Sequence, residues 1–414
     1  MKMNAYVAGV GMVPFGKHLD KTLKSLAGQA IELALNDAGL DKRQLQAAWM
    51  GNAAAGVVTG QEMIRGQVVL RSMGIGRIPV VNVENACASS STAFQQACAM
   101  VSAGYYDIVL ACGYEKLFHQ DKARSLGAFS SAVDVEDPEG ELNVVKKLAE
   151  AAGEPFDAAG AGQSRSVFMD IYAMMAKKHM KLYGTTIEQY AMVASKNSYH
   201  GSLNARAQFR DVLTVEQVLG ARPIIDPLTL PMCSPIGDGA AAVILVSERK
   251  ARQLGLRNPV RVAASELVSG WDFEHAEDSV GAYAAGLAYE AAGIGPQDLS
   301  CVELHDASAP SEIQAYEYLG LCSRGEGGAL VESGATRLGG RIPVNTSGGL
   351  LRKGHPVGAS GCAQIVELTE QLQGRAGARQ VHGARVGLAH NGGGAIGLDA
   401  AATVVSVLVQ EALT

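Results

Sequence analysis

The sequence predicts an α/β fold made of two similar halves, and three observations support this prediction. Apolar runs at residues 241–246 and, with one serine, at 404–409 are typical of strands buried on both faces of a sheet. Residues 33–45 match residues 287–299 without a gap, and in both copies a helix ends at a glycine before a turn into a strand. The segment from 116 to 220 interrupts this pattern because it lacks strand-like runs. We therefore expect a duplicated unit with one insertion.

The internal match also indicates where functional loops should meet. It places His305 just past a strand of the second copy, at the position that Gly51 has in the first copy. The strand before Cys112 likewise parallels the strand before His390. Two similar halves joined face to face would bring such equivalent loops to one shared site.

These patterns divide the chain into three parts. We expect residues 1–115 with 221–250 to form the N-terminal half and residues 251–414 to form the C-terminal half. Residues 116–220 are more polar and are expected to form an inserted domain. Its methionines are spaced irregularly enough to serve in a core or in the wall of an apolar pocket, and we favour the core because methionine fills gaps there. They are Met169, Met174, Met175 and Met180.

Composition narrows the class of protein. The chain has 414 residues, of which 48% are apolar and 18% charged, an ordinary balance for a globular enzyme. The formal net charge of −6 argues against nucleic acid as a principal partner. No apolar run approaches the ~20 residues that a membrane helix needs, and the first residues resemble a strand more than a signal peptide. Seven cysteines without a Cys-x-x-Cys pair predict neither disulfides nor a metal site, so we expect a cytoplasmic protein.

Cys87 is the first candidate for chemistry. It follows a short apolar strand and a turn of small residues, and a helix opens on it. Unpaired N–H groups and the positive end of the helix dipole stabilise a thiolate there, so we expect the pKa of Cys87 to be lowered. Free cysteines are also often inert core residues, which leaves both interpretations open for Cys87 alone. Three histidines in glycine-rich or strand-end surroundings favour the reactive one, namely His305, His355 and His390.

These residues resemble the motifs of thiolases, and specifically of the sterol-carrier-protein-type branch. Residues 345–361 resemble the thiolase signature that ends in Gly-His-Pro-x-Gly-x-Ser-Gly. His305-Asp306 and His390-Asn391-Gly392-Gly393 resemble the His-Asp and His-Asn-x-Gly blocks of that branch, and residues 231–240 and 316–322 are also similar to it. The resemblance extends over nearly the whole chain. It implies a five-layered α/β/α/β/α sandwich in which residues 116–220 form a loop domain over coenzyme A.

One departure from this resemblance affects the chemistry. The branch implies a second catalytic cysteine, the acid/base, at the position of Ala307, and classical thiolases have it at the position of His390. This chain has a cysteine at neither position. Cys301 and Cys362 are near in sequence, but their surroundings favour packing in a core.

The resemblance also implies roles for the remaining residues. His355 would take the proton of Cys87, which attacks the thioester carbonyl of an acyl- or 3-ketoacyl-coenzyme A. His305, with a water, would polarise the second thioester oxygen. His390 is our candidate for the missing acid/base, and water, substrate or a partner subunit are alternatives. Backbone N–H groups of Cys87 and of the glycine run would bind the first oxyanion, the run being Gly392, Gly393 and Gly394.

Three residues beside the histidine loop are candidates for contact with coenzyme A. Arg352 and Lys353 could meet its phosphates, and Ser347 lies just before them in the same glycine-rich segment. The alternative is that these charges are merely solvated, as most exposed ones are.

The preferred function is coenzyme A-dependent thiolysis of a bulky or aromatic 3-ketoacyl-coenzyme A, with coenzyme A as a substrate and no permanently bound cofactor. Thiolase-like subunits of this kind resemble those that work with a small zinc-ribbon/OB-fold protein, as in benzoylsuccinyl-coenzyme A thiolases and steroid side-chain retro-aldolases. Alternatives are a condensing C-acyltransferase, a partner-dependent retro-aldolase and a non-catalytic coenzyme A-binding subunit. The resemblance further implies a homodimer or a dimer of dimers.

Overall fold

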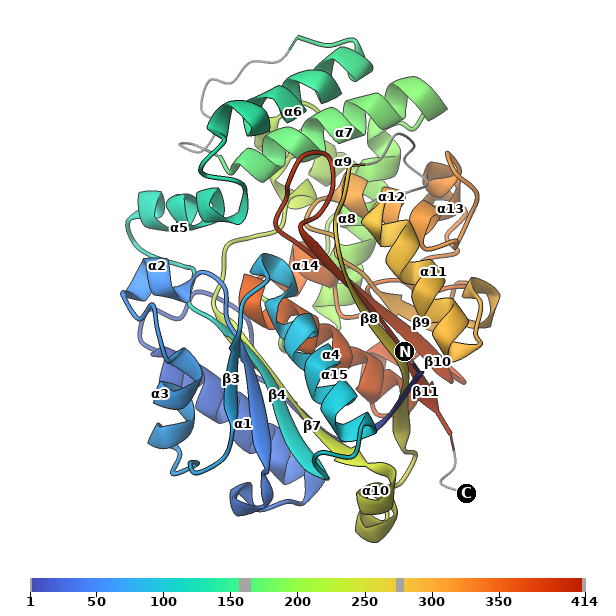
Figure 1. Cartoon of the computed structure of the whole chain (residues 1–414). Helices are drawn as coiled ribbons and strands as arrows, with labels where there is room; N and C mark the ends of the chain where they lie inside the picture. The colour runs from blue at the N-terminus through green and yellow to red at the C-terminus, as the bar shows by residue number, and fades with distance from the viewer. Residues whose placement is uncertain (1, 156–164, 273–278, 412–414) are drawn as a thin grey trace.

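The computed structural model describes residues 2–155, 165–272 and 279–411, and within them nine strands form one continuous sheet (Figure 1). The strand order is β3-β2-β4-β7-β1-β8-β11-β10-β9. The first five strands belong to the N-terminal half and the last four to the C-terminal half. Their bounds are β1 (Lys2–Met12), β2 (Ala47–Gly51), β3 (Val80–Val83), β4 (Ile108–Glu115), β7 (Gly239–Ser247), β8 (Val260–Ser269), β9 (Cys301–Glu303), β10 (Val386–Gly393) and β11 (Ala402–Gln410).

The two halves are joined where β1 pairs with β8 in antiparallel register, with Ala5 opposite Val262. The strand pattern repeats on either side of this junction. In each half an antiparallel strand, β7 or β11, lies beside a parallel pair, β2 with β4 or β9 with β10. A parallel bridge between Val302 and Val344 takes the place in the C-terminal half that β3 has in the N-terminal half. The duplication predicted from the sequence is therefore present in the strand topology.

The matching helices end in the same way. The helices α1 (Leu23–Ala38) and α11 (Val280–Ala292) stop at Gly39 and Gly293, which have φ angles of 63° and 67°. A side chain would be strained in this left-handed conformation, so glycine is the residue that ends both helices. Each helix is followed by a short 3₁₀ turn and then by β2 or β9.

The helices and strands form five layers, which pack on one another through three apolar cores. The helices α1 and α3 (Arg65–Ser72) cover the outer face of the N-terminal strands, and α11 and α12 (Ala309–Tyr318) cover the outer face of the C-terminal strands. Between the two sets of strands lie α4 (Ser89–Ser102) and α15 (Ser360–Leu372), in the centre of Figure 1. Successive strand residues face different cores, as Leu110 and Leu388 face the outer cores while Val109 and Ala389 face the central one.

This arrangement confirms the five-layered sandwich and refines one expectation. The halves do face each other across α4 and α15, as expected. They are also hydrogen-bonded edge to edge through β1 and β8, which the face-to-face expectation did not include. The shared edge leaves β3 and β9 as the outer strands of the sheet.

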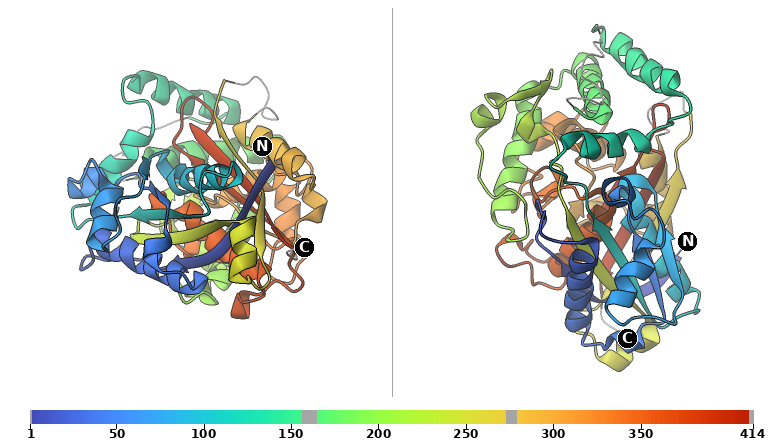
Figure 2. Two further views of the ribbon diagram at one scale, coloured as in Figure 1. Left: turned by 60° about the horizontal axis from the view of Figure 1, so that its bottom comes forward. Right: turned by 90° about the vertical axis from the view of Figure 1, so that its left-hand side faces the viewer.

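Helices make up most of the inserted segment at residues 116–220 that the structure describes, with loops between them. The helices α6 (Pro138–Ala152) and α7 (Val167–Tyr183) lie at one end of the molecule, shown in green at the top of Figure 1 and of the right-hand view of Figure 2. The helix α5 (Lys122–Phe129) lies below them, at the left of Figure 1. In contrast, α8 (Ile187–Ser202) packs against α12, and Tyr190 and Val193 belong to the outer C-terminal core. The segment thus contributes both a cover and a part of the C-terminal half. The exact domain boundaries stay a prediction.

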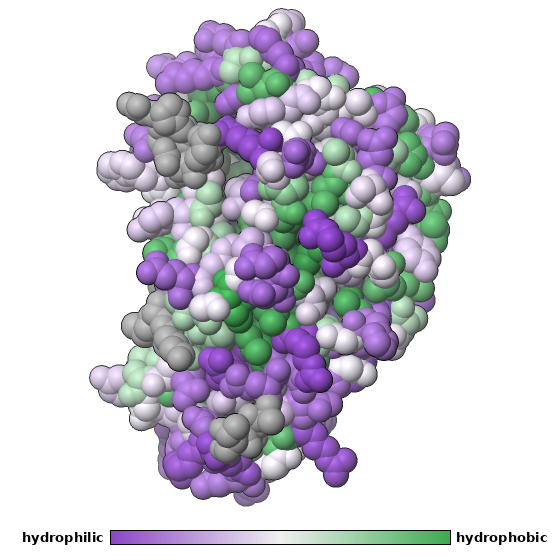
Figure 3. All heavy atoms as spheres, turned by 90° about the vertical axis from the view of Figure 1, so that its right-hand side faces the viewer, coloured by the Kyte–Doolittle hydropathy of each residue, from purple (hydrophilic) through white to green (hydrophobic). Residues whose placement is uncertain are grey.

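The remaining elements connect these layers. They are α2 (Ala55–Thr59), α9 (Val215–Leu219), the two-stranded sheet of β5 (Pro223–Ile225) and β6 (Leu228–Thr229), α10 (Glu248–Leu254), α13 (Gly327–Glu332) and α14 (Gly349–Arg352). None of the helices in the described ranges combines the length and apolarity that crossing a membrane requires. On the face shown in Figure 3, hydrophilic residues dominate both ends and apolar residues gather in a band across the middle.

Candidate active site

A strained turn places Cys87 at the head of the central helix layer. The 3₁₀ helix η2 (Ala86–Ala88) follows β3 and runs directly into α4. Ala86 has a φ of 46°, a left-handed conformation that residues with a side chain rarely adopt. Gly393 at the end of β10 packs against this turn so closely that a Cβ would lie 2.2 Å from the carbonyl oxygen of Asn85. Only glycine at position 393 allows the two halves to approach here.

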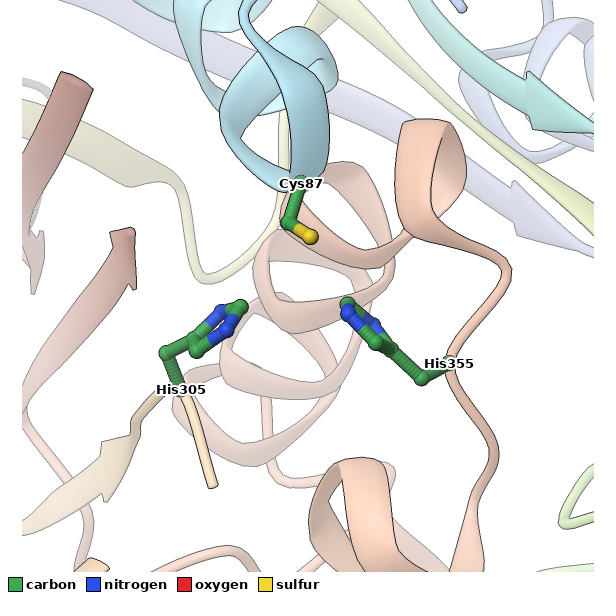
Figure 4. Close-up of side chains that lie close together, drawn as sticks. All are labelled: Cys87, His305 and His355. Carbon is green, nitrogen blue, oxygen red and sulfur yellow. The ribbon is translucent and has the colours of Figure 1, made fainter. Parts of the chain in front are cut away.

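Cys87 meets two histidines of the C-terminal half. Its Sγ and one ring nitrogen each of His305 and His355 lie within 4.8 Å of one another. The two rings are 5.3 Å apart at 85°, and Figure 4 shows the sulfur pointing toward the space between them. The structure thus brings together the nucleophile and two of the histidines that the sequence singled out.

The hydrogen bonds of His355 define which of its nitrogens can act as a base. The Ser360 hydroxyl donates its hydrogen to the carbonyl oxygen of Pro356 at 3.1 Å. It must therefore accept at 2.8 Å from the protonated Nδ1 of His355. This leaves the lone pair of Nε2 on the other side of the ring, free to take a proton. His355 can therefore act as a base through Nε2, with Ser360 fixing its tautomer.

A buried carboxylate holds the His355 loop on the N-terminal half. Glu115, the last residue of β4, accepts from the backbone N–H groups of Ala53, Ala54 and Gly358 at 3.2, 3.1 and 3.0 Å. Burial raises the pKa of Glu115, and these N–H groups act in the opposite direction. The contact to Gly358 positions the loop that carries His355.

Asp306 fixes the neighbouring His305 loop in a similar way. Its carboxylate accepts from the backbone N–H of Leu350 at 2.7 Å and from the side-chain amide of Asn197 at 2.9 Å. A Cβ at Gly349 would lie 2.1 Å from this carboxylate, so glycine is required where the two loops touch. Burial raises the pKa of Asp306 well above its usual range. These contacts place Asp306 where it can hold the loop that carries His305.

His390 lies beside this group and is paired with a tyrosine. It stands on β10, where its Nδ1 accepts from the backbone N–H of His305 at 3.5 Å. Its Nε2 lies 3.4 Å from the hydroxyl of Tyr318, the last residue of α12, and the two rings are 5.2 Å apart. Sequence reasoning gave Tyr318 no role. Its only signal was its place in the segment 316–322, because the contact with His390 joins residues 72 apart.

The pKa of Cys87 is shifted in the direction opposite to the one expected from the sequence. Burial raises the pKa of Cys87 to about 12, and the negative charge of Glu115 adds to this effect, while backbone N–H groups of Cys87 and Gly394 oppose it. The prediction of a lowered pKa is therefore wrong for the empty cavity, because burial outweighs the helix end. Burial lowers the pKa of His305 to about 4 and that of His390 to about 3, and it lowers the pKa of His355 well below 6.5. A neutral thiol thus faces neutral histidines at pH 7.

A cavity of about 870 Å³ opens on these side chains. Cys87, His305, His355, His390, Ala307 and Gly392 to Gly394 line its inner end. Apolar residues of the inserted segment line much of the rest, among them Phe118, Phe129, Met169, Tyr172 and Met175. Met174 is 3% exposed and belongs to the core, and the other three methionines pack against the same core while Met169 and Met175 also line the cavity. Cations also line the cavity, including Lys17, Lys122, Lys178 and Arg222.

The three residues expected to contact coenzyme A lie elsewhere, and this expectation is corrected. Lys353 is 1% exposed and pairs with buried Glu303 at 3.2 Å, and the Ser347 hydroxyl donates to the same carboxylate. Arg352 pairs with Asp211 at 2.6 Å. These side chains hold the loop before His355 in place, because a buried charge requires a partner. None of the three lines the cavity.

Among the described residues, Cys87, His305 and His355 are also the group whose ligand atoms could share a metal ion. Neutral imidazoles and a thiol are suitable zinc ligands by type. The sequence-based expectation that the chain has no metal site stays a prediction.

Comparison with known families agrees with this fold and site. The family model "Thiolase, N-terminal domain" matches residues 5–249, and the model "Thiolase C-terminal domain-like" matches residues 273–407. The chain belongs to the thiolase family of acyltransferases. The solved structure of the Ltp2-ChsH2(DUF35) aldolase has a similar fold, with a TM-score of 0.76 at 24% identity and coverage of 99% of both chains.

Curated relatives place the chain more narrowly. It is 40% identical to an acetyl-CoA acetyltransferase of Methanothermobacter thermautotrophicus, over 94% of this chain and 96% of that one. It is 37% identical to sterol carrier protein 2 of Rattus norvegicus, over 96% of this chain and 71% of that one. It is 35% identical to the benzoylsuccinyl-CoA thiolase subunit BbsB of Thauera aromatica, over 95% of this chain and 96% of that one. These matches confirm the resemblance to the sterol-carrier-protein-type branch.

Proposed function

We propose that this protein cleaves a 3-ketoacyl-coenzyme A by thiolysis through an acyl-enzyme on Cys87. The observation that carries the proposal is the convergence of Cys87, the Nε2 of His355 and His305 at the inner end of one large cavity. This is the arrangement that nucleophilic catalysis needs, with a base beside the nucleophile and a third group that orients the base. Ser360 is that third group.

The first step follows from the protonation states. Because the thiol of Cys87 is neutral at rest, His355 must remove its proton as the sulfur attacks the 3-keto carbon. The backbone N–H groups of Cys87 and Gly394, which lie near the sulfur, are placed to stabilise the oxyanion that forms. His305 lies on the other side of the sulfur and would polarise the thioester oxygen of the leaving group. Its Nδ1 is buried without a protein partner, which suits such a contact.

The cavity supports a bulky acyl group. Its volume of about 870 Å³ lies toward the upper end of the range for small-molecule sites, and aromatic and methionine side chains line it. The relative BbsB is named for benzoylsuccinyl-CoA, an aromatic substrate. We propose an aromatic or similarly bulky substrate here. Lys17, Lys122 and Arg222 are the charges we assign to the phosphates of coenzyme A, in place of Arg352 and Lys353.

A partner protein is part of the proposal. BbsB is described as a subunit, and the Ltp2-ChsH2(DUF35) aldolase has two named components. We propose that this chain works with a second, small protein. The expectations of a homodimer or a dimer of dimers and of a cytoplasmic location stay predictions. The expectation that no cofactor is permanently bound and that coenzyme A is a substrate also stays a prediction.

The alternative functions can be compared with thiolysis by asking whether each of them needs Cys87 and His355. A condensing C-acyltransferase would use the same acyl-enzyme in the reverse direction. A retro-aldolase needs no acyl-enzyme, so the buried pair of Cys87 and His355 favours thiolysis. A non-catalytic subunit would need neither residue.

Intact-protein mass spectrometry with a panel of acyl- and 3-ketoacyl-coenzyme A thioesters tests the proposal. The protein should gain the mass of one acyl group, and Cys87→Ala should gain none. Cys112→Ala is the matched control, because Cys112 is a buried strand residue away from the cavity. A mass gain that persists in Cys87→Ala would overturn the proposal.

A further inference from the structure

Thiolysis requires a second proton transfer that Ala307 cannot perform. When the carbon–carbon bond breaks, its electron pair goes to C2 of the leaving thioester, and C2 must then receive a proton. Ala307 lines the cavity and is 5% exposed, so a methyl group occupies the position where the resemblance implies a cysteine. Another group that faces the same cavity must supply the proton.

The hydrogen bonds of His390 determine how its tyrosine partner is oriented. The backbone N–H of His305 donates to Nδ1, so this nitrogen carries a lone pair and the ring proton sits on Nε2. The Nε2–H then donates to the Tyr318 hydroxyl oxygen across 3.4 Å. The hydroxyl therefore accepts from His390 and keeps its own hydrogen for another acceptor.

Tyr318 has no competing acceptor near by. Among the described residues, His390 is the hydrogen-bond partner of the Tyr318 hydroxyl. Both side chains line the cavity, as does Ala307, and Tyr318 follows Ala307 by eleven positions on the helix that begins just after it. His390 itself is less suited, because each of its nitrogens already has a partner. Tyr318 thus keeps an O–H that it can donate within the cavity, and because burial raises the pKa of this hydroxyl, only a strongly basic group such as the C2 carbanion would take its proton.

We propose that Tyr318 is the catalytic acid/base that acts at C2 and that His390 positions it. The inference rests on the proposed thiolysis and names the group for its second proton transfer. His390 holds the hydroxyl oxygen through Nε2–H and stabilises the phenolate that forms when Tyr318 gives up its proton.

The step balances without a further reactant. Cys87 forms a bond to the 3-keto carbon, the C2–C3 bond breaks, and C2 takes the hydroxyl proton of Tyr318. The shortened acyl-coenzyme A leaves, and the phenolate takes the thiol proton of the incoming coenzyme A. The resulting coenzyme A thiolate attacks the acyl-enzyme, and the sulfur of Cys87 leaves and recovers its proton from His355. Over the cycle, the thiol proton of coenzyme A ends on C2.

Three variants and two measurements test this role. Tyr318→Phe removes the hydroxyl but keeps the ring that packs on His390. Tyr289→Phe is the matched control, because the Tyr289 hydroxyl donates to the backbone carbonyl of Leu319 at 2.7 Å and Tyr289 is not among the residues that line the cavity. Tyr318→Phe combined with Ala307→Cys supplies the cysteine that the resemblance implies. For each protein, the acyl adduct on Cys87 is measured by mass, and exchange of the C2 hydrogens of the acyl-coenzyme A is measured in D₂O.

The two measurements separate this inference from the proposed function. We expect the adduct in all proteins, and we expect Tyr318→Phe to slow exchange about 100-fold or more, as general acid–base catalysis typically contributes that much. Tyr289→Phe should exchange at the rate of the parent, and the combined variant should recover a part of the loss. Exchange at the parental rate in Tyr318→Phe, with the adduct still formed, would overturn the role of Tyr318 alone. Absence of the adduct in the parent protein would overturn the proposed function and this inference with it.

Discussion

The two halves share a strand pattern but differ at the strand ends that face the site. In the N-terminal half, β3 connects to α4 through the short turn that carries Cys87. In the C-terminal half, the bridge at Val344 connects to α15 through a longer loop that carries His355. The two central helices are thus reached by loops of unequal length, and the longer one brings His355 across to Cys87. The comparison indicates that the duplicated strands and helices form a common scaffold. The candidate catalytic residues lie on loops that differ in length between the two halves.

The halves also differ in what holds their loops. Buried ion pairs anchor the loops of the C-terminal half, where Lys353 pairs with Glu303 and Lys196 pairs with Glu312 at 2.8 Å. Near Cys87 the turn is held by the side chains of Glu84 and Ser89, which accept from and donate to the backbone of Ala86 at 2.6 Å, and by the close approach of Gly393. We infer that the longer histidine-bearing loops need charged anchors because they have more backbone to fix.

Among the substitutions that test this difference between the halves, replacement of Cys87 should have the largest effect. Cys87→Ala should lower thiolysis by about 10⁴-fold or more, because loss of a nucleophile removes the covalent route. Cys112→Ala, at the position in the first half that corresponds to His390, should keep near-parental activity in the same steady-state assay. Comparable losses of activity in both variants would contradict the view that Cys87 takes part in the reaction while Cys112 belongs to the scaffold.

The tautomer of His355 should have the next largest effect. Ser360→Ala removes the acceptor for Nδ1–H, so the ring is no longer held with Nε2 as the base, and we expect kcat to fall about 10- to 100-fold. The measurement is the rate of acyl-enzyme formation. Ser202→Ala is the control, because that hydroxyl only donates to Tyr199 within α8. An unchanged rate in Ser360→Ala would contradict the role given to Ser360.

The anchors can be tested through stability. Lys353→Met leaves Glu303 buried without its cation, which should lower the free energy of unfolding by about 3–5 kcal/mol. Adding Glu303→Leu should recover much of this loss, because a buried pair can be replaced by apolar residues. Denaturant unfolding of the single and double variants measures both values. A double variant no more stable than Lys353→Met would show that the other partners of Glu303, such as Ser347, matter more than the pair.

Sequence-based prediction succeeded for features set by local patterns and failed for features set by distant residues. The helix ends at Gly39 and Gly293 follow from local patterns, so the duplication was predictable. The burial of Arg352 and Lys353 was not, because their counter-charges are 141 and 50 residues away. The pKa of Cys87 was missed for the same reason, since burial by distant segments outweighs the helix end next to it.

The site's missing acid/base illustrates the same limit. The absence of a cysteine at position 307 is visible in the sequence, and His390 was a reasonable candidate because of its glycine-rich surroundings. Tyr318 could not be found from sequence alone. Its orientation depends on a backbone N–H of His305 acting through the ring of His390.

A smaller effect is expected from pH. His200 is neutral in the fold, with its Nδ1–H donating to Asn345 and its Nε2 accepting from Leu338, and burial lowers its pKa to about 3. Unfolding releases it to an ordinary pKa of about 6.5, so the unfolded chain binds more protons below that pH. Stability from His200 is therefore present above pH 6.5 and is lost as pH falls toward 3, by about 2 kcal/mol at pH 5. His200→Gln should show a shallower loss between pH 7 and 5 in denaturant unfolding, and an equal slope would contradict the assignment.

The smallest effect concerns the resting thiol. Because burial raises the pKa of Cys87 to about 12, alkylation by iodoacetamide should keep accelerating up to pH 10 in the absence of substrate. The rate is measured by mass spectrometry of the peptide that contains Cys87, with Cys87→Ala as a blank. A plateau near pH 7 would indicate a thiolate stabilised by the helix end and would restore the expectation drawn from sequence.

The central claim is that Cys87 of one half and the histidines of the other catalyse thiolysis in two separable steps. An acyl-enzyme forms on Cys87 in the first step, and its acyl group passes to coenzyme A in the second. A single-turnover experiment tests it most directly. The protein is mixed with one equivalent of a 3-ketoacyl-coenzyme A that it accepts, first without and then with free coenzyme A. The account predicts release of the shortened thioester in the first phase, with the remaining acyl group mapped to Cys87, and release of the new acyl-coenzyme A only after coenzyme A is added. Cleavage in the first phase with no acyl group on Cys87 would contradict it.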